Sequence, residues 1–309
     1  MNDRALVKIR FCARESADRG DSILGTATES SCYLLVECAG AWPSKVADIL
    51  FASGIPEGLS RALREFIAWC PEVVHPLLIK QPGRLGPPRI YLVRSNPAAG
   101  KCLRYDDFDN DFFAALQDAY VHPGHIGDIA LVCTHGKKDK CCAKFGEPVY
   151  DRFRIELKDK FEVFQCSHIG GDRFAANVIW LPYGIHLGHV HTELSAAIDK
   201  LRTKSIPLQN LRGRASLPSA AQYLEGHLRA KLSLENPGAF ELLDYRERDV
   251  SGKLFCFVSL RDVILGEVHE GYVSIHRSTS RVLSSCNTDS EAHPRVFSLI
   301  DEVTYNGNG

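Results

Sequence analysis

The sequence lacks the features of a membrane or secreted protein. None of its apolar runs approaches the roughly 20 residues that a membrane-spanning helix needs. The first residues, M-N-D-R-A-L-V-K-I-R, carry charges where a secretory signal peptide needs an uninterrupted apolar core. The formal net charge is only -1, so no overall charge attracts nucleic acid or an anionic membrane surface. These absences predict a cytoplasmic protein with no nucleic-acid or membrane partner.

No C-x-x-C pair occurs among the 11 cysteines. The cysteines are odd in number and spread from Cys12 to Cys286 in a chain without a secretory signal, which disfavours a disulfide framework. Most of them are expected to be small buried apolar side chains, because they lie within apolar patterns. The missing C-x-x-C also counts against a thiol oxidoreductase of the thioredoxin kind.

What the sequence does contain is typical of a globular protein with more than one structural unit. Hydrophobic residues make up 45% of the 309 residues and charged residues 24%, which are ordinary values for a globular chain. The length is large for a single domain. It predicts about two domains.

The apolar patterns predict one unit twice. The first copy has strands over residues 32–37, 73–80 and 89–94, and helices over residues 59–70 and about 107–119. The second has strands over residues 129–132 and 161–166, a hairpin of 177–181 with 185–190, and helices over 148–157 and 194–201. Pro148 is expected in the first turn of its helix, where no backbone donor is needed. Strand, helix, strand, hairpin and helix is the thioredoxin-like order.

The predicted fold class is therefore α/β, with two tandem thioredoxin-like modules and a small α+β region at the C-terminal end. We expect an N-terminal module over residues 1–125 without metal ligands, a second module over residues 126–205 that carries them, and the α+β region over residues 206–309. This last region should contain a helix over 220–232 and strands over 240–245, 254–260 and 272–276.

Two motifs in the second module contain residues that bind metals. The first, I-A-L-V-C-T-H-G-K-K-D-K-C-C-A-K-F-G, places Cys133 at the end of a strand and Cys141 with Cys142 after a lysine-rich loop. Nearby cations lower the pKa of a thiol and favour the thiolate that a metal needs. The second motif, C-S-H-I-G-G-D-R-F-A, presents His168 and Asp172 after the next strand. The two motifs thus offer two pairs of candidate metal ligands.

These motifs, together with R-G-D-S-I-L-G-T-A, Y-L-L-V-E and L-R-G-R-A-S-L-P, resemble the sucrase/ferredoxin-like family. The resemblance covers most of the chain. It implies a thioredoxin-fold electron carrier whose 2Fe-2S cluster is held by a cysteine pair from the first motif and by H-x-x-x-H from the second. Carried over by position, the cysteines are Cys133 and Cys142 and the first histidine is His168. The second histidine position holds Asp172, which departs from the family pattern.

That departure leaves three hypotheses for the fourth ligand, because a carboxylate is a harder ligand than imidazole or thiolate. Asp172 binds through oxygen, Cys166 supplies a third thiolate, or the site binds a cluster weakly or not at all. Cys141 is a possible substitute for Cys142, although adjacent cysteines point in different directions. Gly170 and Gly171 are expected to allow close backbone approach to the cofactor.

Three functions follow from these ligands. The leading one is a 2Fe-2S electron carrier serving an unknown redox partner protein, and we expect an electron-transfer protein rather than a catalyst. The alternatives are a thiol oxidoreductase that uses Cys133 with Cys141 or Cys142, and a zinc-stabilised binding module, since the same ligands suit tetrahedral zinc. The sequence names neither the redox partner nor the oligomeric state.

Other polar residues have simpler interpretations. His186, His189 and His191 are expected to be ordinary surface or core residues rather than a metal site. Arg212 and Arg214 are expected to form structural ion pairs rather than an anion site.

Overall fold

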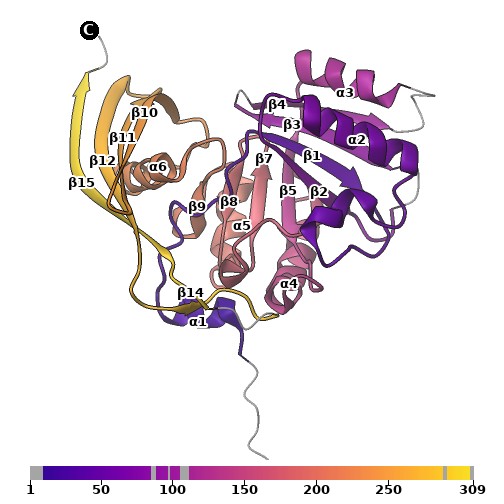
Figure 1. The fold of residues 1–309 in the computed structure, drawn as a ribbon, viewed down its shortest axis with the longest axis horizontal. Helices are drawn as coiled ribbons and strands as arrows, with labels where there is room; N and C mark the ends of the chain where they lie inside the picture. The colour runs from indigo at the N-terminus through magenta and orange to yellow at the C-terminus, as the bar shows by residue number, and fades with distance from the viewer. Residues whose placement is uncertain (1–9, 85–87, 97, 105–110, 288–290, 307–309) are drawn as a thin grey trace, which may run out of the picture.

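The computed structural model describes residues 10–84, 88–96, 98–104, 111–287 and 291–306. Its centre is a mixed sheet of nine strands in the order β4-β3-β1-β2-β6-β5-β7-β8-β9. A separate sheet, in the order β10-β11-β12-β15, lies beside it and packs on helix α6 (Figure 1). The predicted α/β class is confirmed. Among the described residues, no helix combines the length and hydrophobicity needed to cross a membrane.

The first half of the large sheet comes from the N-terminal part of the chain. Its elements are β1 (Cys32–Glu37), α2 (Glu57–Trp69), β2 (Val74–Lys80), β3 (Arg89–Ser95), β4 (Ala98–Arg104) and α3 (Phe112–Val121), with a 3-10 turn at Val46–Phe51. All six residues of β1 are buried, as expected for a strand covered on both faces. The predicted start of the second helix, at residues 107–110, lies outside the described residues.

The second half repeats this arrangement. Its elements are β5 (Asp128–Cys133), α4 (Lys140–Glu156), β6 (Phe161–Cys166), β7 (Val178–Leu181), β8 (Ile185–Leu187) and α5 (Leu194–Arg202). A 3-10 turn at Asp172–Phe174 precedes β7. A further 3-10 turn, Leu208–Asn210, leads into β9 (Leu211–Arg214), which pairs with β8.

Strand pairing follows the same rule in both halves. In the first, β1 pairs in parallel with β2 and antiparallel with β3, which pairs with β4. In the second, β5 pairs in parallel with β6 and antiparallel with β7, which pairs with β8. An antiparallel contact between β2 and β6 joins the halves into one sheet. The cysteine-bearing end of β5 therefore lies near the middle of the sheet.

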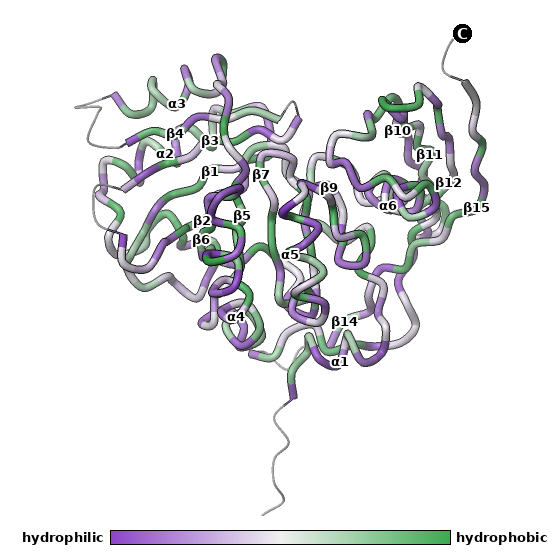
Figure 2. Tube along the Cα trace, turned by 180° about the vertical axis from the view of Figure 1, so that it is seen from behind, coloured by the Kyte–Doolittle hydropathy of each residue, from purple (hydrophilic) through white to green (hydrophobic). Residues whose placement is uncertain are grey.

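The sheet curls so that inner faces of the two halves pack together. The core between them contains Tyr33 and Leu35 of β1 with Leu131 of β5 and Ile179 of β7. Helices α2 and α3 cover the outer face of the first half, while α4 and α5 cover the second (Figure 1). Figure 2 shows hydrophobic residues along the central strands.

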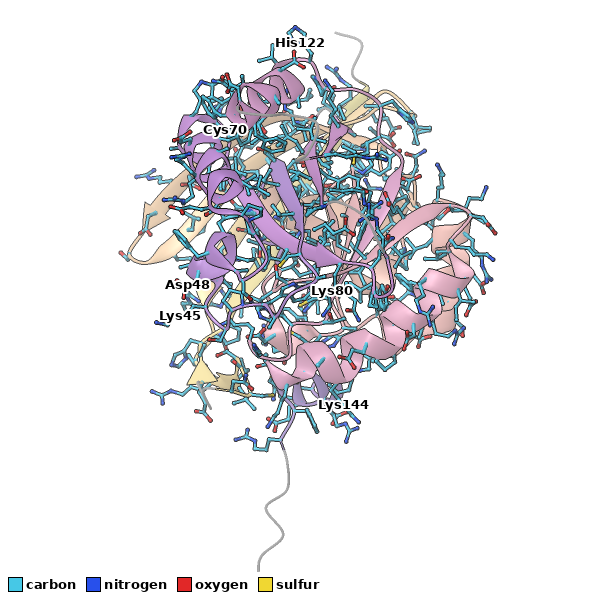
Figure 3. The ribbon with its side chains drawn as sticks, turned by 90° about the vertical axis from the view of Figure 1, so that its right-hand side faces the viewer. Lys45, Asp48, Cys70, Lys80, His122 and Lys144 are labelled. Atoms are coloured by element: carbon cyan, nitrogen blue, oxygen red, sulfur yellow. The ribbon has the colours of Figure 1, made fainter. Side chains whose placement is uncertain are left out.

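The terminal segments meet beside α4. Helix α1 (Cys12–Asp18) lies next to the strand pair β13 (Val282–Leu283) and β14 (Glu291–Ala292), as Figure 1 shows. The C-terminal region contains α6 (Ser219–Leu232), β10 (Phe240–Val250), β11 (Lys253–Asp262), β12 (Glu267–Arg277) and β15 (Arg295–Asn306). In Figure 3 the α4 residue Lys144 lies at the opposite end of the molecule from Cys70 and His122, which follow α2 and α3.

Two sequence-based predictions were wrong in detail. The helix predicted to begin at Pro148 begins at Lys140, because Asp139 caps it, so Pro148 lies in the helix interior. Strand β4 was not predicted, because Ala98, Ala99 and Gly100 have little strand propensity; its pairing with β3 along seven residue pairs stabilises it.

Candidate metal centre

Two cysteines lie where β5 ends and α4 begins. Strand β5 ends at Cys133, and the following loop leads to Asp139, whose carboxylate accepts a hydrogen bond of 2.8 Å from the backbone N–H of Cys141. This cap fixes the first turn of α4. The first turn contains both Cys141 and Cys142, and adjacent helical residues point about 100° apart. The two thiols therefore face different parts of the molecule.

A glycine lets α4 approach the strand. A Cβ atom on Gly146 would lie 2.0 Å from the carbonyl oxygen of Cys133, far inside any allowed contact. Gly146 follows Cys142 by four residues, so both lie on the same face of α4. The missing side chain thus brings the Cys142 thiol close to the end of β5.

The second motif forms a loop that buried side chains hold in place. Gly170 and Gly171 have φ angles of 82° and 77°, a region that favours glycine. Nη1 of Arg212 donates hydrogen bonds of 3.0 Å to the Gly170 carbonyl and to Oδ1 of Asn177. Nδ2 of Asn177 donates to the Gly171 carbonyl at 2.8 Å. These bonds fix the loop between His168 and Asp172, whose side chains lie 3.1 Å apart.

The prediction that Arg212 forms an ion pair was wrong. Its guanidinium donates hydrogen bonds to backbone carbonyls, the Asn177 amide oxygen and the Thr26 hydroxyl, all of which are neutral. Burial lowers the pKa of Arg212 to about 10. Arg214 does form the predicted ion pair, with Glu225 at 3.2 Å.

The structure brings Cys133, Cys142 and His168 together. Their ligand atoms all lie within 4.8 Å of one another, and Cys133 and Cys142 are 1% and 0% exposed. Oδ1 of Asp172 lies 3.1 Å from Nδ1 of His168 and 3.7 Å from Sγ of Cys142. Asp172 therefore borders the three-residue group without lying within 4.8 Å of every member.

The two substitute ligands are not members of this close group. Cys166 is buried at the end of β6 and pairs across the ladder with Cys133, but among the described residues it is not part of the close ligand group. Sγ of Cys141 lies 3.6 Å from Sγ of Cys12 and 3.3 Å from Sγ of Cys286, so Cys141 belongs to a second group.

Electrostatic interactions at the site favour the thiolate form of Cys133 over that of Cys142. The hydrogen bond from the Cys142 thiol, together with His168, holds the pKa of Cys133 well below its usual value despite burial, and raises that of Cys142. Burial alone would lower the pKa of His168, but Cys133 and Asp172 outweigh it and raise that pKa. Burial raises the pKa of Asp172 to about 6.

The donor set fits a metal cofactor. Nδ1 of His168 is buried and lies 3.1 Å from Oδ1 of Asp172 without forming a hydrogen bond, so in the neutral ring this nitrogen can offer its lone pair to a metal next to the carboxylate. Two thiolates and an imidazole are ligands of both 2Fe-2S clusters and zinc. A fourth ligand would come from Asp172, whose carboxylate lies beside both His168 and Cys142.

His135 supports this site in a way that the sequence did not reveal. Its Nδ1 accepts a hydrogen bond of 3.2 Å from the backbone N–H of His168, and its ring packs edge-on against Trp42. His135 therefore fixes the backbone of the candidate ligand His168. Among the other histidines, His186 is an ordinary core residue, as predicted. It is buried and bonds the Tyr33 hydroxyl at 3.1 Å.

Sequence reasoning also missed Cys12 and Cys286 as partners of Cys141. Each stands alone in its own stretch of sequence, more than a hundred residues from Cys141, so no local spacing indicates the contact.

Comparison with known proteins identifies the family. The profile of the sucrase/ferredoxin-like family matches residues 23–213, which include both motifs of the site. The chain belongs to the sucrase/ferredoxin-like family. The matched region runs from the segment before β1 to β9, so α1 and the C-terminal sheet lie outside it.

One curated relative shares a shorter segment. The chain is 41% identical over 58 residues to Altered inheritance of mitochondria protein 32 from Debaryomyces hansenii. This alignment covers 18% of the present chain and 21% of that protein, so it spans about a fifth of the relative's length. No solved structure matches the chain.

Proposed function

We propose that the protein is an electron carrier that holds a 2Fe-2S cluster with Cys133, Cys142 and His168, and with Asp172 as the fourth ligand. The observation that carries this proposal is the convergence of two buried thiols and an imidazole, from two separate loops, within 4.8 Å of one another. Family membership supports it. When bound, the cluster would supply one-electron transfer.

The chain's own residues would control access to the cofactor. The thiols of Cys133 and Cys142 are buried, whereas the His168 side chain is 13% exposed. Electrons would therefore enter and leave at the histidine edge, where a partner protein can approach. Lys137 is exposed on the adjoining loop, and it would favour an acidic partner surface.

The repeated strand connectivity supports the finer description of the fold. Each half has the strand order second, first, third, fourth, with a parallel first pair and an antiparallel second one. We propose that the halves are thioredoxin-like modules over residues 1–125 and 126–205, followed by an α+β region over residues 206–309 whose first strand, β9, pairs with β8 of the second module.

We propose a cytoplasmic location. The name of the Debaryomyces hansenii relative refers to mitochondria, so imaging of a fluorescent fusion against mitochondrial and cytosolic markers tests this assignment. Exclusive overlap with the mitochondrial marker would overturn it.

Two alternative functions use the same residues. The low pKa of Cys133 beside Cys142 is what a thiol oxidoreductase needs, but both thiols are almost inaccessible to a substrate disulfide. A zinc site would also accept these donors. Visible colour that bleaches on reduction separates the cluster from both alternatives, because zinc and dithiol forms are colourless.

The test is purification under anaerobic conditions, followed by analysis of iron and acid-labile sulfide. The proposal expects a coloured protein in which Cys133→Ser, Cys142→Ser and His168→Ala each lose most of the iron. Cys141→Ser distinguishes the two adjacent thiols, because the Cys141 thiol faces elsewhere and its loss should leave the iron in place. Cys256→Ser, at a cysteine buried in the C-terminal sheet, is the matched control. Iron that is lost with Cys141→Ser and kept with Cys142→Ser would contradict the assignment.

A further inference from the structure

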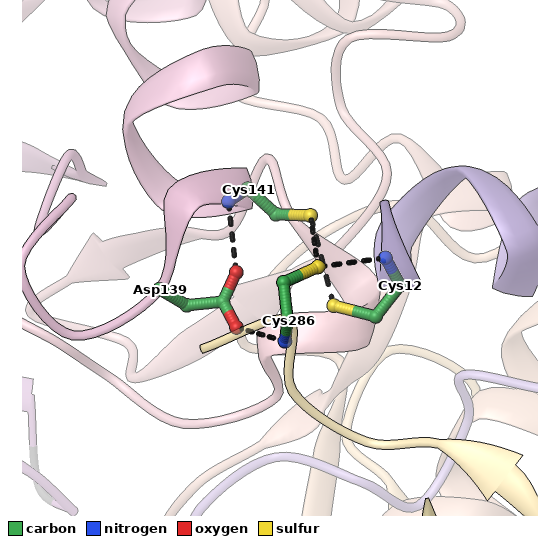
Figure 4. A group of neighbouring side chains, drawn as sticks. All are labelled: Cys12, Asp139, Cys141 and Cys286. Carbon is green, nitrogen blue, oxygen red and sulfur yellow. Dashed lines mark hydrogen bonds between the residues drawn. The ribbon is translucent and has the colours of Figure 1, made fainter. Parts of the chain in front are cut away.

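A second group of cysteines lies behind the first turn of α4. It brings together Cys12 from α1, Cys141 from α4 and Cys286 from the segment after β13 (Figure 4). Sγ of Cys141 lies 3.6 Å from Sγ of Cys12 and 3.3 Å from Sγ of Cys286. The exposed fractions of the three residues are 0%, 0% and 7%, so the sulfurs are shielded from bulk water.

A buried carboxylate completes this group. Asp139 is fully buried, and its Oδ1 accepts a hydrogen bond from the backbone N–H of Cys141 at 2.8 Å. Its Oδ2 accepts bonds from the Ser285 hydroxyl at 2.7 Å and from the backbone N–H of Cys286 at 2.6 Å. Asp139 thereby fixes the backbone of two of the cysteines. The four ligand atoms all lie within 4.8 Å of one another.

The spacing of the sulfurs suits a bound metal. Zinc–sulfur bonds of about 2.3 Å in a tetrahedral site place the sulfurs about 3.8 Å apart, close to the two separations here. The Sγ of Cys286 also accepts a hydrogen bond of 2.9 Å from the backbone N–H of Cys12, and the N-terminal end of α4 points into the group. Both features stabilise negative charge on sulfur. A disulfide would join only two of the three cysteines and leave a buried thiol.

We propose that Cys12, Cys141, Cys286 and Asp139 form a structural site for a thiophilic divalent cation of the zinc class. On binding, each of the three thiols loses its proton to solvent and donates a sulfur lone pair to the cation, while the ionised carboxylate supplies the fourth ligand; no electron is transferred. The occupied site ties α1 and the C-terminal segment to α4, although both lie outside the region that the family shares. This inference does not depend on the cluster proposal.

The experiment measures zinc per chain in the full-length protein purified without chelators. Wild type should contain about one zinc per chain, whereas Cys12→Ser and Cys286→Ser should lose most of it. The matched control is Cys256→Ser, because Cys256 is equally buried but lies in the C-terminal sheet. Cys133→Ser should keep its zinc, which separates this site from the cluster site whether or not iron is present.

A second measurement avoids reliance on variants at the site itself. Cobalt(II) added to the zinc-stripped Cys133→Ser protein should give thiolate-to-cobalt charge-transfer absorption, which zinc should then abolish. The proposal is overturned if wild type binds no zinc after zinc is supplied. It is also overturned if Cys133→Ser loses the zinc while Cys286→Ser keeps it, or if non-reducing peptide mapping of the isolated protein shows Cys141 and Cys286 joined by a disulfide.

Discussion

Asp172 occupies the position at which the H-x-x-x-H pattern has its second histidine. Its carboxylate lies 3.1 Å from Nδ1 of His168 and 3.7 Å from the Cys142 sulfur. Burial raises its pKa to about 6, while the neighbouring His168 opposes that rise by favouring the ionised form. A bound metal ion would favour the ionised form further. At the scale of single residues, Asp172 is the candidate ligand at which the chain departs from the family pattern, so it is the most informative one to change.

Asp172→His tests its role. If the carboxylate binds the cofactor, an imidazole ligand in its place should shift the visible spectrum and the reduction potential, because ligand identity sets both. If Cys166 is the fourth ligand instead, the spectrum and potential should stay nearly unchanged. Absorption spectra and a redox titration of both proteins make the comparison, and Cys166→Ser serves as the reciprocal variant.

The residues that position the candidate metal ligands were harder to predict from the sequence than the candidate ligands themselves. Cys133, Cys142 and His168 stand in recognisable motifs, so the sequence alone selects them. Arg212 and His135 act through hydrogen bonds to a loop that is distant in sequence, and no local pattern indicates those contacts.

At the scale of elements, the first turn of α4 contributes residues to both proposed metal sites. Asp139 caps the helix, Cys142 faces the end of β5, and Cys141 faces α1 and the C-terminal segment. The sequence predicted the helix but placed its start at Pro148, since proline favours a first turn. Asp139, which caps the helix immediately before K-C-C, indicates the start of the helix better than Pro148 does. Strand β5, by contrast, was predictable from its continuous apolar run.

Gly146→Ala should displace this helix. The added Cβ would meet the Cys133 carbonyl oxygen at 2.0 Å, and both atoms belong to rigid elements. We expect a loss of about 1–3 kcal/mol in the free energy of unfolding, as overpacking typically costs, and a lower iron content. Urea unfolding and iron analysis measure the two effects.

Lys144→Ala is the control for this variant. Lys144 lies on the exposed side of the same helix (Figure 3), so its loss should change neither stability nor iron content appreciably. A Gly146→Ala protein as stable and as iron-rich as the Lys144→Ala protein would show that α4 does not depend on this close approach.

At the scale of the whole molecule, the two halves form one curled sheet. The Tyr33 hydroxyl of β1 lies 3.1 Å from Nε2 of His186 in β8, across the core between the halves. Long-range packing of this kind could not be derived from the sequence. The apolar patterns around Tyr33 and Leu181 indicate that these residues are buried, but not which residues they contact. The order of the elements along the chain was largely predictable. The pairing of β2 with β6, which joins the two halves into one sheet, was not.

A buried histidine in this core, His186, makes the free energy of unfolding depend on pH. Burial, with a smaller contribution from Arg212, lowers the pKa of His186 well below 6.5, so the folded state holds the ring neutral. The unfolded chain takes up a proton as pH falls through 6.5, so folding loses stability there, by up to about 1.4 kcal/mol per pH unit.

His186→Gln keeps an acceptor for Tyr33 without a titrating group. Between pH 7 and pH 5, wild type should lose about 2 kcal/mol more of its unfolding free energy than this variant does. Urea unfolding at both pH values measures the difference. Equal losses in the two proteins would mean that His186 does not stay neutral in the folded state.

The central claim is that two thiolates and the His168 imidazole hold paired irons. The most direct measurement is electron paramagnetic resonance of the chemically reduced protein, labelled with nitrogen-15 in its histidines. We predict a one-electron-reduced cluster signal with strong hyperfine coupling to histidine nitrogen, and loss of that coupling in His168→Cys. A cluster signal without histidine coupling, or an anaerobically purified protein with no signal at all, would contradict the claim.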